Sequence, residues 1–508
     1  MRPCDRELST MRSHTGTLRL AIMLAVLWLA PQICAAHDNV LQIRVRTSAE
    51  LVNAILAANA HSGTAVIKVA PGHFVLTDRF DSEFGPSRLP PVKSTIFMIG
   101  DNAATTILET EGFFQTGRLI TVLPHGRITI RRMTLSGGSA ADLGESIANG
   151  GGAIGNFGGF LRVDDCVLSH NNAAMEDGSG AGGAILSIDG RLHVEGSRLE
   201  DNSAVNVAGA IAIRHGSGLI RRSVISGNRA GGQFSGAAGG ILVVDGTLGI
   251  YGSTIARNIV DSGDLDDVVQ GGGIVNAEGR VWLINSAVVE NVAEPIGFAG
   301  GISNTGTMYI LNTTISGNSA ASSGGGIYNL EKGTIRLQNA TIVANDAGGL
   351  TDPLDQIPSS CTLETLEGCV AGGGGIWNLA PGRIVMAATV IAGNQARLSA
   401  DCNGRLVSNG HNALGDKDHC KLVPFVSGQV ANDLVGVDPR VGELEDDGEP
   451  GRAHVPLQAG SPLIDAGGRV KHDCTPLDQL GQPRVDGNNN GKTFCDIGAI
   501  EFQPKHRN

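Results

Sequence analysis

Aromatic side chains are scarce in this sequence, whose 508 residues include 13 Phe, 3 Tyr and 3 Trp against 73 Gly. So few large side chains favour a thin, repetitive core over a compact globule. The formal net charge of −12 argues against nucleic acid or an anionic membrane as a partner. The sequence also lacks a Cys-x-x-Cys pair, a phosphate-binding loop and a legible Ser-His-Asp set, so the enzyme classes that these motifs mark are not indicated.

Long apolar runs are also absent, apart from one near the N-terminus. There Arg12 and Arg19 precede the apolar stretch Leu20–Ala30, and Cys34-Ala35-Ala36 offers a small-x-small cleavage site. The stretch is too short to cross a bilayer, which takes about 20 apolar residues, but it has the layout of a secretory signal. We therefore predict a signal peptide over residues 1–36, export of the chain, and no membrane span in the mature protein.

A repeat dominates the rest of the chain. Eight copies of one pattern, a Gly-Gly or Ala-Gly pair followed by two aliphatic stretches and an Asn, run from Gly151 to Ala396. Aliphatic residues, once a Met, stand three and eight positions before the closing Asn, and small residues stand five positions before it. The copies close on Asn171, Asn202, Asn228, Asn258, Asn291, Asn318, Asn345 and Asn394.

This pattern predicts the fold class. Inward positions two residues apart have the period of a β-strand and not of a helix. Self-similarity at this length indicates a solenoid, in which each coil buries its apolar face against its neighbours. We predict an all-β, right-handed parallel β-helix with two or three short strands per coil and a hydrogen-bonded Asn ladder. A β-propeller is the less favoured alternative, because it needs about four strands per repeat and a longer period.

Residues outside the repeats are expected to cap the solenoid. Segment 47–60 has apolar residues at helical spacing, so we predict a short helix that covers the N-terminal end of the core. The cap and the first coils then occupy residues 37–136, and the repetitive coils occupy residues 137–398, with an insertion at 348–371. After Ala396 the pattern fades into a polar C-terminal region, residues 399–508.

Cysteine usage agrees with export, because seven cysteines remain after the signal peptide. Neighbouring positions favour three disulfides in an oxidising compartment, although spacing alone leaves the connectivity open. The pairs are Cys361 with Cys369, Cys402 with Cys420, and Cys474 with Cys495. Cys166 is left over and falls in the small inward column, so we predict a buried, unreactive thiol there.

The C-terminal region contains three motifs in order, GSPLIDAG, DQLGQPR and CDIGAIE. With them, this region resembles the choice-of-anchor Q domain found at the end of many secreted bacterial β-helix proteins. The repeats are similar to those of polymorphic outer-membrane-type and pectin-lyase-like β-helices. The resemblance implies a bacterial protein that is secreted or held at the cell surface, but it implies no single activity. Because no sorting tail precedes Asn508, we expect free secretion or periplasmic residence as further outcomes.

Charged residues gather at one corner of successive coils. Asp164 and Asp165 are adjacent, and Glu195 lies one coil further along in the Asp164 column. Arg221 and Arg222 follow in the same two columns. Such a group could bind a sugar acid or perform acid–base chemistry; the favoured alternative is a solvated corner with ion pairs between coils. The paired carboxylates of polygalacturonase-like hydrolases and the Asp-His signature of pectate lyases are not legible.

A calcium loop is the one metal site that the sequence hints at. Asp486, Asn488 and Asn490 copy the first half of a D-x-N-x-N-G calcium loop. The bidentate Glu that should close the loop is missing, so an ordinary Gly/Asn turn is the favoured interpretation. We predict that the protein requires no cofactor and name calcium as the one candidate ion.

The outward column nine positions before the closing Asn is irregular. Trp282 and Tyr309 occupy it in adjacent coils, and Arg336 follows in the next coil. Exposed rings at coil spacing form a stacking platform for sugar rings, and Arg adds directional hydrogen bonds to hydroxyls or carboxylates. The alternative is that aromatic residues simply suit strands or are covered by the 348–371 insertion.

These features together predict an exported, monomeric β-helix that binds an extended ligand along its outer face. The expected partner is a polysaccharide or a cell-surface glycan. A polysaccharide lyase or glycoside hydrolase of pectin-lyase-like fold is the rival hypothesis, and a structural or adhesive surface protein is the third.

Overall fold

A computed structural model describes residues 39–110, 117–140, 149–173, 180–232, 236–262, 268–348, 372–426, 432–470, 473–488 and 490–504. The chain divides into a short unit, Met1–Asn39, and a large unit, Val40–Asn508, which holds every described helix and strand. The predicted signal peptide lies outside the described residues, as do Cys361 and Cys369. Within the described ranges, no helix is long and apolar enough to cross a membrane.

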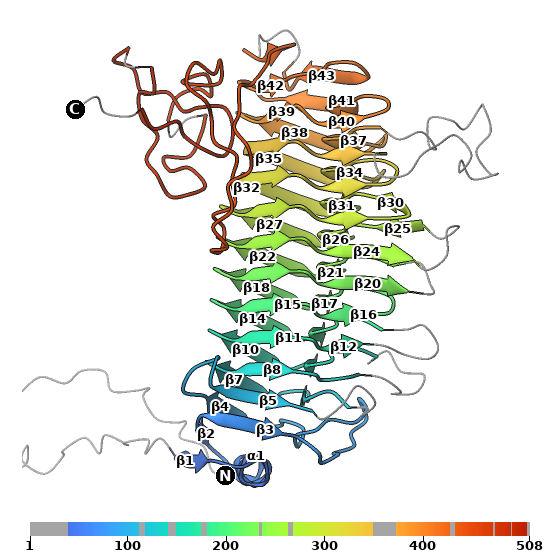
Figure 1. Cartoon of the computed structure of the whole chain (residues 1–508), viewed down its shortest axis with the longest axis vertical. Coiled ribbons are helices and arrows are strands. Elements are labelled where there is room, and N and C mark those ends of the chain that lie inside the picture. The colour runs from blue at the N-terminus through green and yellow to red at the C-terminus, as the bar shows by residue number, and fades with distance from the viewer. Residues whose placement is uncertain are drawn as a thin grey trace, which may run out of the picture. The chain divides into compact units, whose positions relative to one another are not determined.

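The large unit is a parallel β-solenoid, as the repeat predicts. Each strand pairs in parallel with the corresponding strand of the next coil (Figure 1). A coil contains three main strands and a short fourth strand at the Asn corner, one strand more than expected. The first strands are β9 (Ile154–Phe157), β13 (Ile185–Ile188), β17 (Ile211–Arg214), β21 (Ile241–Val244), β26 (Ile274–Ala277), β31 (Ile302–Asn304), β34 (Ile327–Asn329) and β37 (Ile376–Asn378).

The second and third strands follow around a sharp corner, and in β32 and β35 they merge into one strand. The second strands are β10 (Phe160–Asp164), β14 (Arg191–Glu195), β18 (Ser217–Arg221), β22 (Thr247–Tyr251), β27 (Arg280–Ile284), β32 (Thr307–Ser316), β35 (Thr334–Val343) and β38 (Arg383–Ala387). The separate third strands are β11 (Val167–Ser169), β15 (Arg198–Glu200), β19 (Val224–Ser226), β23 (Thr254–Ala256), β28 (Ala287–Val289) and β39 (Val390–Ala392).

The short fourth strands form a sheet of their own. They are β12 (Asn172–Ala173), β16 (Ser203–Ala204), β20 (Arg229–Gly232), β24 (Ile259–Ser262), β29 (Val292–Ala293), β33 (Ser319–Ala320), β36 (Asp346–Ala347) and β40 (Gln395–Ala396). One further parallel pair, β25 (Val268–Gln270) with β30 (Ile296–Phe298), lies beside them.

The predicted Asn ladder runs through the eight repeat coils. From Asn171 to Asn345, each side-chain amide donates to the Oδ1 atom of the Asn one coil on, at 2.9 Å. Asn394 ends the ladder by donating to Oδ1 of Asp401, also at 2.9 Å. Because a buried amide without a partner costs about 1–3 kcal/mol, the unbroken ladder keeps every coil in register.

The small inward column contains Cys166, as predicted. Its thiol is almost fully buried, and its backbone N–H donates to the hydroxyl of Ser197 one coil on, at 3.1 Å. Burial raises the pKa of the Cys166 thiol to about 12. The raised pKa disfavours the thiolate that reacts with oxidants or metals. The predicted burial of Cys166 is confirmed, and its lack of reactivity stays a prediction.

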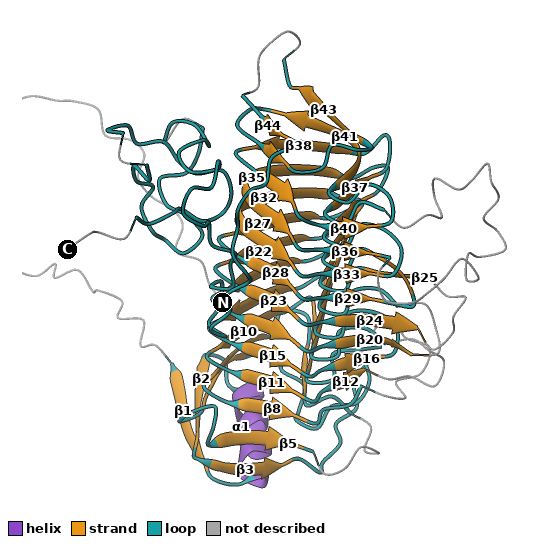
Figure 2. Ribbon diagram, turned by 45° about the horizontal axis from the view of Figure 1, so that its top comes forward, coloured by secondary structure: helices purple, strands orange, loops and turns teal. Residues whose placement is uncertain are grey.

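The N-terminal end is closed by the predicted helix, α1 (Ser48–Ala60) (Figure 2). Thr47 caps it by accepting the backbone N–H of Glu50 on its hydroxyl at 3.2 Å. Leu51 and Ile55 are buried against the first coils, so the helix covers the open core. These coils contain β1 (Val40–Val45), β2 (Thr64–Val69), β3 (Gly72–Val75), β4 (Thr95–Ile99), β5 (Thr106–Glu109), β6 (Ile120–Val122), β7 (Arg127–Arg131) and β8 (Thr134–Ser136).

The coils continue past Ala396, where the sequence pattern fades. Parallel pairing extends from β37 to β41 (Cys402–Ser408) and on to β43 (Cys420–Pro424). The short strands β42 (Ala413–Leu414) and β44 (Leu434–Val435) accompany them. The repeat is hard to read here because the Gly-Gly pair is lost, while the inward residues stay apolar. Asp401, which aligns with the second Gly of the pair, ends the ladder with its carboxylate.

After these coils the chain turns back as a tail, residues 438–504, which packs against the third strands (Figure 1). The Gly451 N–H donates to the Thr254 hydroxyl at 2.8 Å, and the Ala499 N–H donates to the Thr341 hydroxyl at 2.9 Å. Ala453 packs into a buried cluster with Ala256, Ala287 and Val289. The tail thus covers the third strands of the coils beside it.

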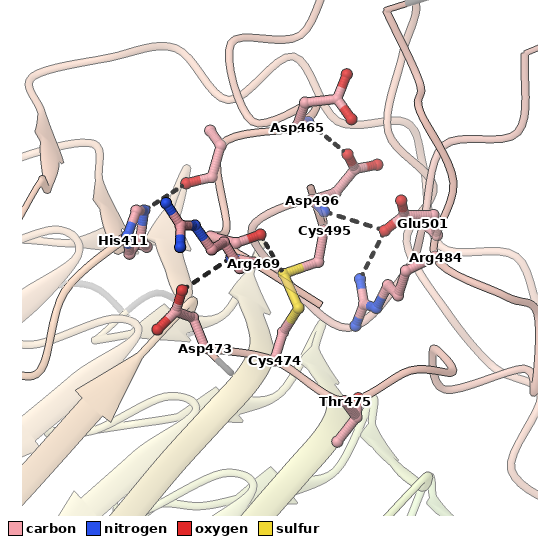
Figure 3. The surroundings of a disulfide bond; sticks show 12 residues. His411, Asp465, Arg469, Asp473, Cys474, Thr475, Arg484, Cys495, Asp496 and Glu501 are labelled. Atoms are coloured by element: carbon pink, nitrogen blue, oxygen red, sulfur yellow. Dashed lines mark hydrogen bonds and ion pairs between the residues drawn. A yellow bond between two sulfur atoms is a disulfide. The ribbon is translucent and has the colours of Figure 1, made fainter. Parts of the chain in front are cut away.

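Both cysteine pairs within the described residues form disulfides, as predicted. Cys402–Cys420 joins the last coils, with its Cα atoms 5.4 Å apart. Cys474–Cys495 joins two segments of the tail, with its Cα atoms 6.6 Å apart. Figure 3 shows the second disulfide beside the buried ion pair of Arg484 and Glu501, whose Nη1 and Oε2 atoms are 2.9 Å apart.

Candidate ligand-binding face

The second strands carry the candidate site on their outer side. Residues at the second and fourth positions of each strand, such as Leu161 and Val163, point into the core. The first, third and fifth residues therefore point outward. Strict parallel pairing aligns them in three columns that continue on β1, β2, β4, β7, β41 and β43. We call these three outward columns the second-strand face.

The central column of this face contains the three residues singled out from the sequence. Trp282 pairs with Tyr309, which pairs with Arg336, on three successive coils. The rings of Trp282 and Tyr309 are stacked, with centroids 5.8 Å apart and an interplanar angle of 10°. The Arg336 guanidinium carbon lies 5.8 Å from the Tyr309 centroid. The rings are half-buried and Arg336 is exposed, so solvent reaches all three side chains.

A third aromatic residue, Tyr251, lies one coil before Trp282 and was missed from the sequence. It belongs to the neighbouring column, but on its coil the central position is Gly249. A Cβ atom on Gly249 would lie 2.6 Å from the Tyr251 ring, so the ring leans over the space that glycine leaves. The sequence signal that could have identified Tyr251 is a glycine followed two residues later by an aromatic residue, one coil before Trp282.

Arginines stand at both ends of this aromatic strip, defined as Tyr251, Trp282 and Tyr309. Arg221, one coil before Tyr251, places its guanidinium carbon 5.4 Å from the Tyr251 centroid. Arg336 takes the same position beside Tyr309 at the other end. A guanidinium over a ring face is attracted by the ring quadrupole and keeps its N–H groups free for other acceptors. The strip therefore offers apolar ring surface between two planar hydrogen-bond donors.

The charged corner lies on the same face but differs from the expectation of a solvated carboxylate pair. Pairing does align Asp164 with Glu195 and Glu195 with Arg221. Asp164, however, is only 5% exposed, and its Oδ2 atom accepts from Nε of Arg162 at 2.8 Å. Arg131 packs on its other side, with Nε and Oδ2 3.5 Å apart. Arginines on both flanking positions bury the carboxylate, which the sequence pattern alone does not reveal.

The other predicted corner residues separate from this ion pair. Glu195 pairs with Arg222, with Oε1 and Nη2 2.6 Å apart. Arg221 turns to Tyr251 instead of a carboxylate. Asp165 lies at the bend after the strand, with a left-handed φ of 52°. Ion pairs between coils are therefore present, as the favoured alternative of the sequence analysis expects, but Asp164 is not solvated and Arg221 forms no ion pair within the described residues.

His193 is a second residue that was passed over. Its Nδ1 atom accepts from Nη1 of Arg162 at 3.0 Å, and its Nε2 atom lies 3.5 Å from Glu195. Burial and the charge of Arg162 lower the pKa of His193 below its usual value. The imidazole therefore bonds to a guanidinium through Nδ1 and has a carboxylate near Nε2, an arrangement that suits acid–base chemistry.

The calcium-loop candidate forms a self-contained turn. The carboxylate of Asp486 accepts the backbone N–H groups of Asn490 at 3.0 Å and Gly491 at 2.6 Å. Oδ1 of Asn488 also accepts the Asn490 N–H, at 3.1 Å. Across the described parts of the chain, no three His, Cys, Asp or Glu residues cluster as a metal site would require. Calcium binding here stays a prediction. The side-chain oxygens of Asp486 and Asn488 already accept backbone N–H groups of the turn.

Comparisons with known proteins give only distant likenesses. No family model matches the chain, and no curated protein matches it in sequence. Among solved structures, pectate lyase Pel9A aligns with a TM-score of 0.37 and 13% identity, over 91% of this chain and 96% of that one. The A-module of the Azotobacter vinelandii mannuronan C-5 epimerase AlgE6 aligns with a TM-score of 0.33 and 13% identity, over 77% and 95%. The AlgE4 A-module aligns with a TM-score of 0.30 and 12% identity, over 78% and 98%.

Proposed function

We propose that this protein binds an extended carbohydrate along the second-strand face, with the aromatic strip as its main contact. The observation that carries the proposal is the placement of Tyr251, Trp282 and Tyr309 on three successive coils of an open face. Coils are spaced about 4.8 Å apart, so a polymer lying parallel to the stack meets one ring per coil. Apolar ring surface contacts the C–H groups of sugars, while Arg221 and Arg336 donate to hydroxyl or acid groups.

The location proposed for this activity is outside the cytoplasm, as a secreted, periplasmic or cell-surface bacterial protein. Two disulfides within the described residues support an oxidising compartment. The signal-peptide layout of residues 1–36 and the choice-of-anchor Q resemblance of residues 399–508 support export. Neither a partner protein nor a cofactor is needed for the proposed binding.

A lyase or hydrolase remains the second candidate, favoured by one observation. His193 and Glu195 lie on the same face two coils before Tyr251, and the buried Asp164 lies three coils before it. A glycan running along the central column would pass over His193. Release of unsaturated or reducing ends from a bound polysaccharide, abolished by His193→Ala, would establish this activity; the same products from His193→Ala would exclude a role for that residue.

The binding proposal is tested with a panel of soluble polysaccharides and single ring deletions. Trp282→Ala and Tyr309→Ala should each weaken the best binder by up to about tenfold, since aromatic contacts of this kind contribute about 0.5–1.5 kcal/mol. Phe97→Ala is the matched control, because Phe97 occupies the same central column on β4, is 37% exposed and lies far from the strip. Unchanged binding in both strip variants contradicts the proposal.

A further inference from the structure

The second-strand face has the opposite charge balance to the chain as a whole. The sequence contains 38 Lys and Arg against 50 Asp and Glu, yet the only carboxylates in the three columns are Asp164 and Glu195. The cationic residues of the three columns are Arg44, Lys68, Arg127, Arg131, Arg162, Arg191, Arg221, Arg280, Arg336, Arg383, Arg405 and Lys421. Positive charge is therefore concentrated on the one face that also carries the aromatic strip.

Most of these cations have no carboxylate beside them. Within the described part of the chain, only Arg131 and Arg162 of the twelve form an ion pair, both with Asp164. On other parts of the solenoid some exposed arginines do find carboxylates: Arg198 pairs with Glu200 at 3.1 Å, and Arg229 pairs with Asp261. In a chain with an excess of acids, ten cations thus share one face with no carboxylate paired to them among the described residues.

Aromatic rings hold several of these guanidinium groups in place. Arg127 lies over Phe160 with 4.7 Å between the guanidinium carbon and the ring centroid, on the neighbouring coil. Arg221 over Tyr251 and Arg336 over Tyr309 repeat the arrangement on other coils. A ring orients a guanidinium but does not neutralise it, so the positive charge and the N–H fork remain available to an anion. A planar fork of this kind binds carboxylate or sulfate in bidentate fashion.

We infer that the ligand of this face is a linear anionic polysaccharide, bound parallel to the coil stack with its acid groups paired to these arginines. The inference rests on the proposed carbohydrate function and adds the chemical class of the polymer. Arg280 lies on the coil of Trp282, and Arg336 and Arg383 lie on the two coils after Tyr309. These three arginines would take the acid groups of the bound segment. Carboxylates and sulfates share the required chemistry. A single-stranded nucleic acid fits less well, because rings 5.8 Å apart leave no space for a base to stack between them.

The test compares polymers of matched length and different charge by titration calorimetry. A polyuronate and a sulfated glycan represent the two anionic classes, and a neutral glucan and single-stranded DNA serve as the contrasts. At least one anionic polysaccharide should bind more than tenfold tighter than the glucan, and its binding should weaken strongly between about 0.1 M and 1 M salt, as the Debye length falls from about 10 to 3 Å. The tighter of the two anionic polymers identifies the acid group.

Variants locate the charge contacts. Arg280→Gln and Arg383→Gln should each lower affinity for the anionic polymer by about threefold to tenfold, with unchanged thermal unfolding. Arg198→Gln, a third-strand arginine that is 45% exposed and already paired, is the control and should change nothing. Salt-independent binding of the neutral glucan, equal to that of the anionic polymers, would overturn the inference while leaving the proposed function intact. Tighter binding of the DNA would also overturn it, whereas binding of no polysaccharide would defeat the proposed function itself.

Discussion

The second-strand and third-strand faces of the solenoid share one strand register but differ in composition and burial. Outward residues of the third strands are small or apolar where the tail covers them, as in Ala256, Ala287 and Val289. Outward residues of the second strands on the same coils are Tyr251, Trp282 and Ile284, which are half-buried and lie beside unpaired arginines. The tail reaches this face further along, where Gln338 donates to the Asp473 carbonyl at 3.4 Å. The third-strand face is buried by its own chain, whereas the second-strand face keeps ring surface and charge exposed to solvent.

The third-strand face therefore contributes to stability, whereas the second-strand face is available for binding. The third-strand face satisfies its hydroxyl groups internally, through bonds such as Thr314 to Gln479 at 2.6 Å. The second-strand face leaves guanidinium donors without carboxylate partners, which costs little in water but offers strong contacts to an anion. Substitutions in the covered face should therefore change stability, and substitutions in the open face should change binding.

The largest expected effect lies in the buried ion pair of the tail. Arg484 and Glu501 are fully buried and bonded to each other, so Arg484→Ala leaves an uncompensated carboxylate inside the tail. We expect a loss of about 3–5 kcal/mol of tail stability, measured as faster proteolysis of residues 438–504 at a moderate denaturant concentration. Polysaccharide binding on the second-strand face should persist under native conditions. A tail that resists proteolysis as in the wild type would contradict this view of the covered face.

A charge placed on each face sharpens the comparison. Ala287→Asp puts a carboxylate beneath the tail, with no cation within its apolar cluster, and should cost about 3 kcal/mol or more. Leu219→Asp puts the same group on the half-buried central column of the open face and should cost less than about 1 kcal/mol. Urea denaturation of both variants measures the difference. Equal losses of unfolding free energy in the two variants would show that the two faces do not differ in burial.

A pH effect on stability is also expected, through Asp496 in the tail. Burial, followed by the charge of Glu501, raises the pKa of Asp496 to about 8 from its ordinary 3.8. Between these values the folded tail holds a proton that the unfolded chain releases, so stability falls as pH rises from about 4 to 8. Tail unfolding followed at pH 5 and pH 8 should show this loss. Asp496→Asn should flatten the slope; an unaltered slope would assign the pH dependence to other groups.

Much of the fold is predictable because the solenoid repeats local rules. The aliphatic columns, the Asn ladder and the inward Cys166 follow from spacing within one coil, and α1 follows from its helical period. The contacts between the tail and the coils could not be predicted in this way. They join residues far apart in sequence, such as Gly451 and Thr254, and no periodicity encodes such a pairing. The coils after Ala396 were also missed, because the Gly-Gly pair of the repeat is lost there.

For the second-strand face, the alignment of residues on successive coils was predictable, but the directions of their side chains were not. Counting back from the closing Asn places Trp282, Tyr309 and Arg336 on adjacent coils, and the strand pairing agrees. The inclination of Tyr251 over Gly249 and the burial of Asp164 depend on which way long side chains turn. Those directions are set by neighbours on the coils before and after, so they emerge only once the stack is built.

Oxidative footprinting of the free and ligand-bound protein tests the central claim most directly. Hydroxyl radicals label exposed aromatic side chains, and the polyuronate or sulfated glycan that binds most tightly supplies the bound state. The account predicts that Tyr251, Trp282 and Tyr309 become protected while Phe97, far along the same column, keeps its reactivity. Protection of the tail instead, with Trp282 and Tyr309 labelled as in the free protein, would contradict it.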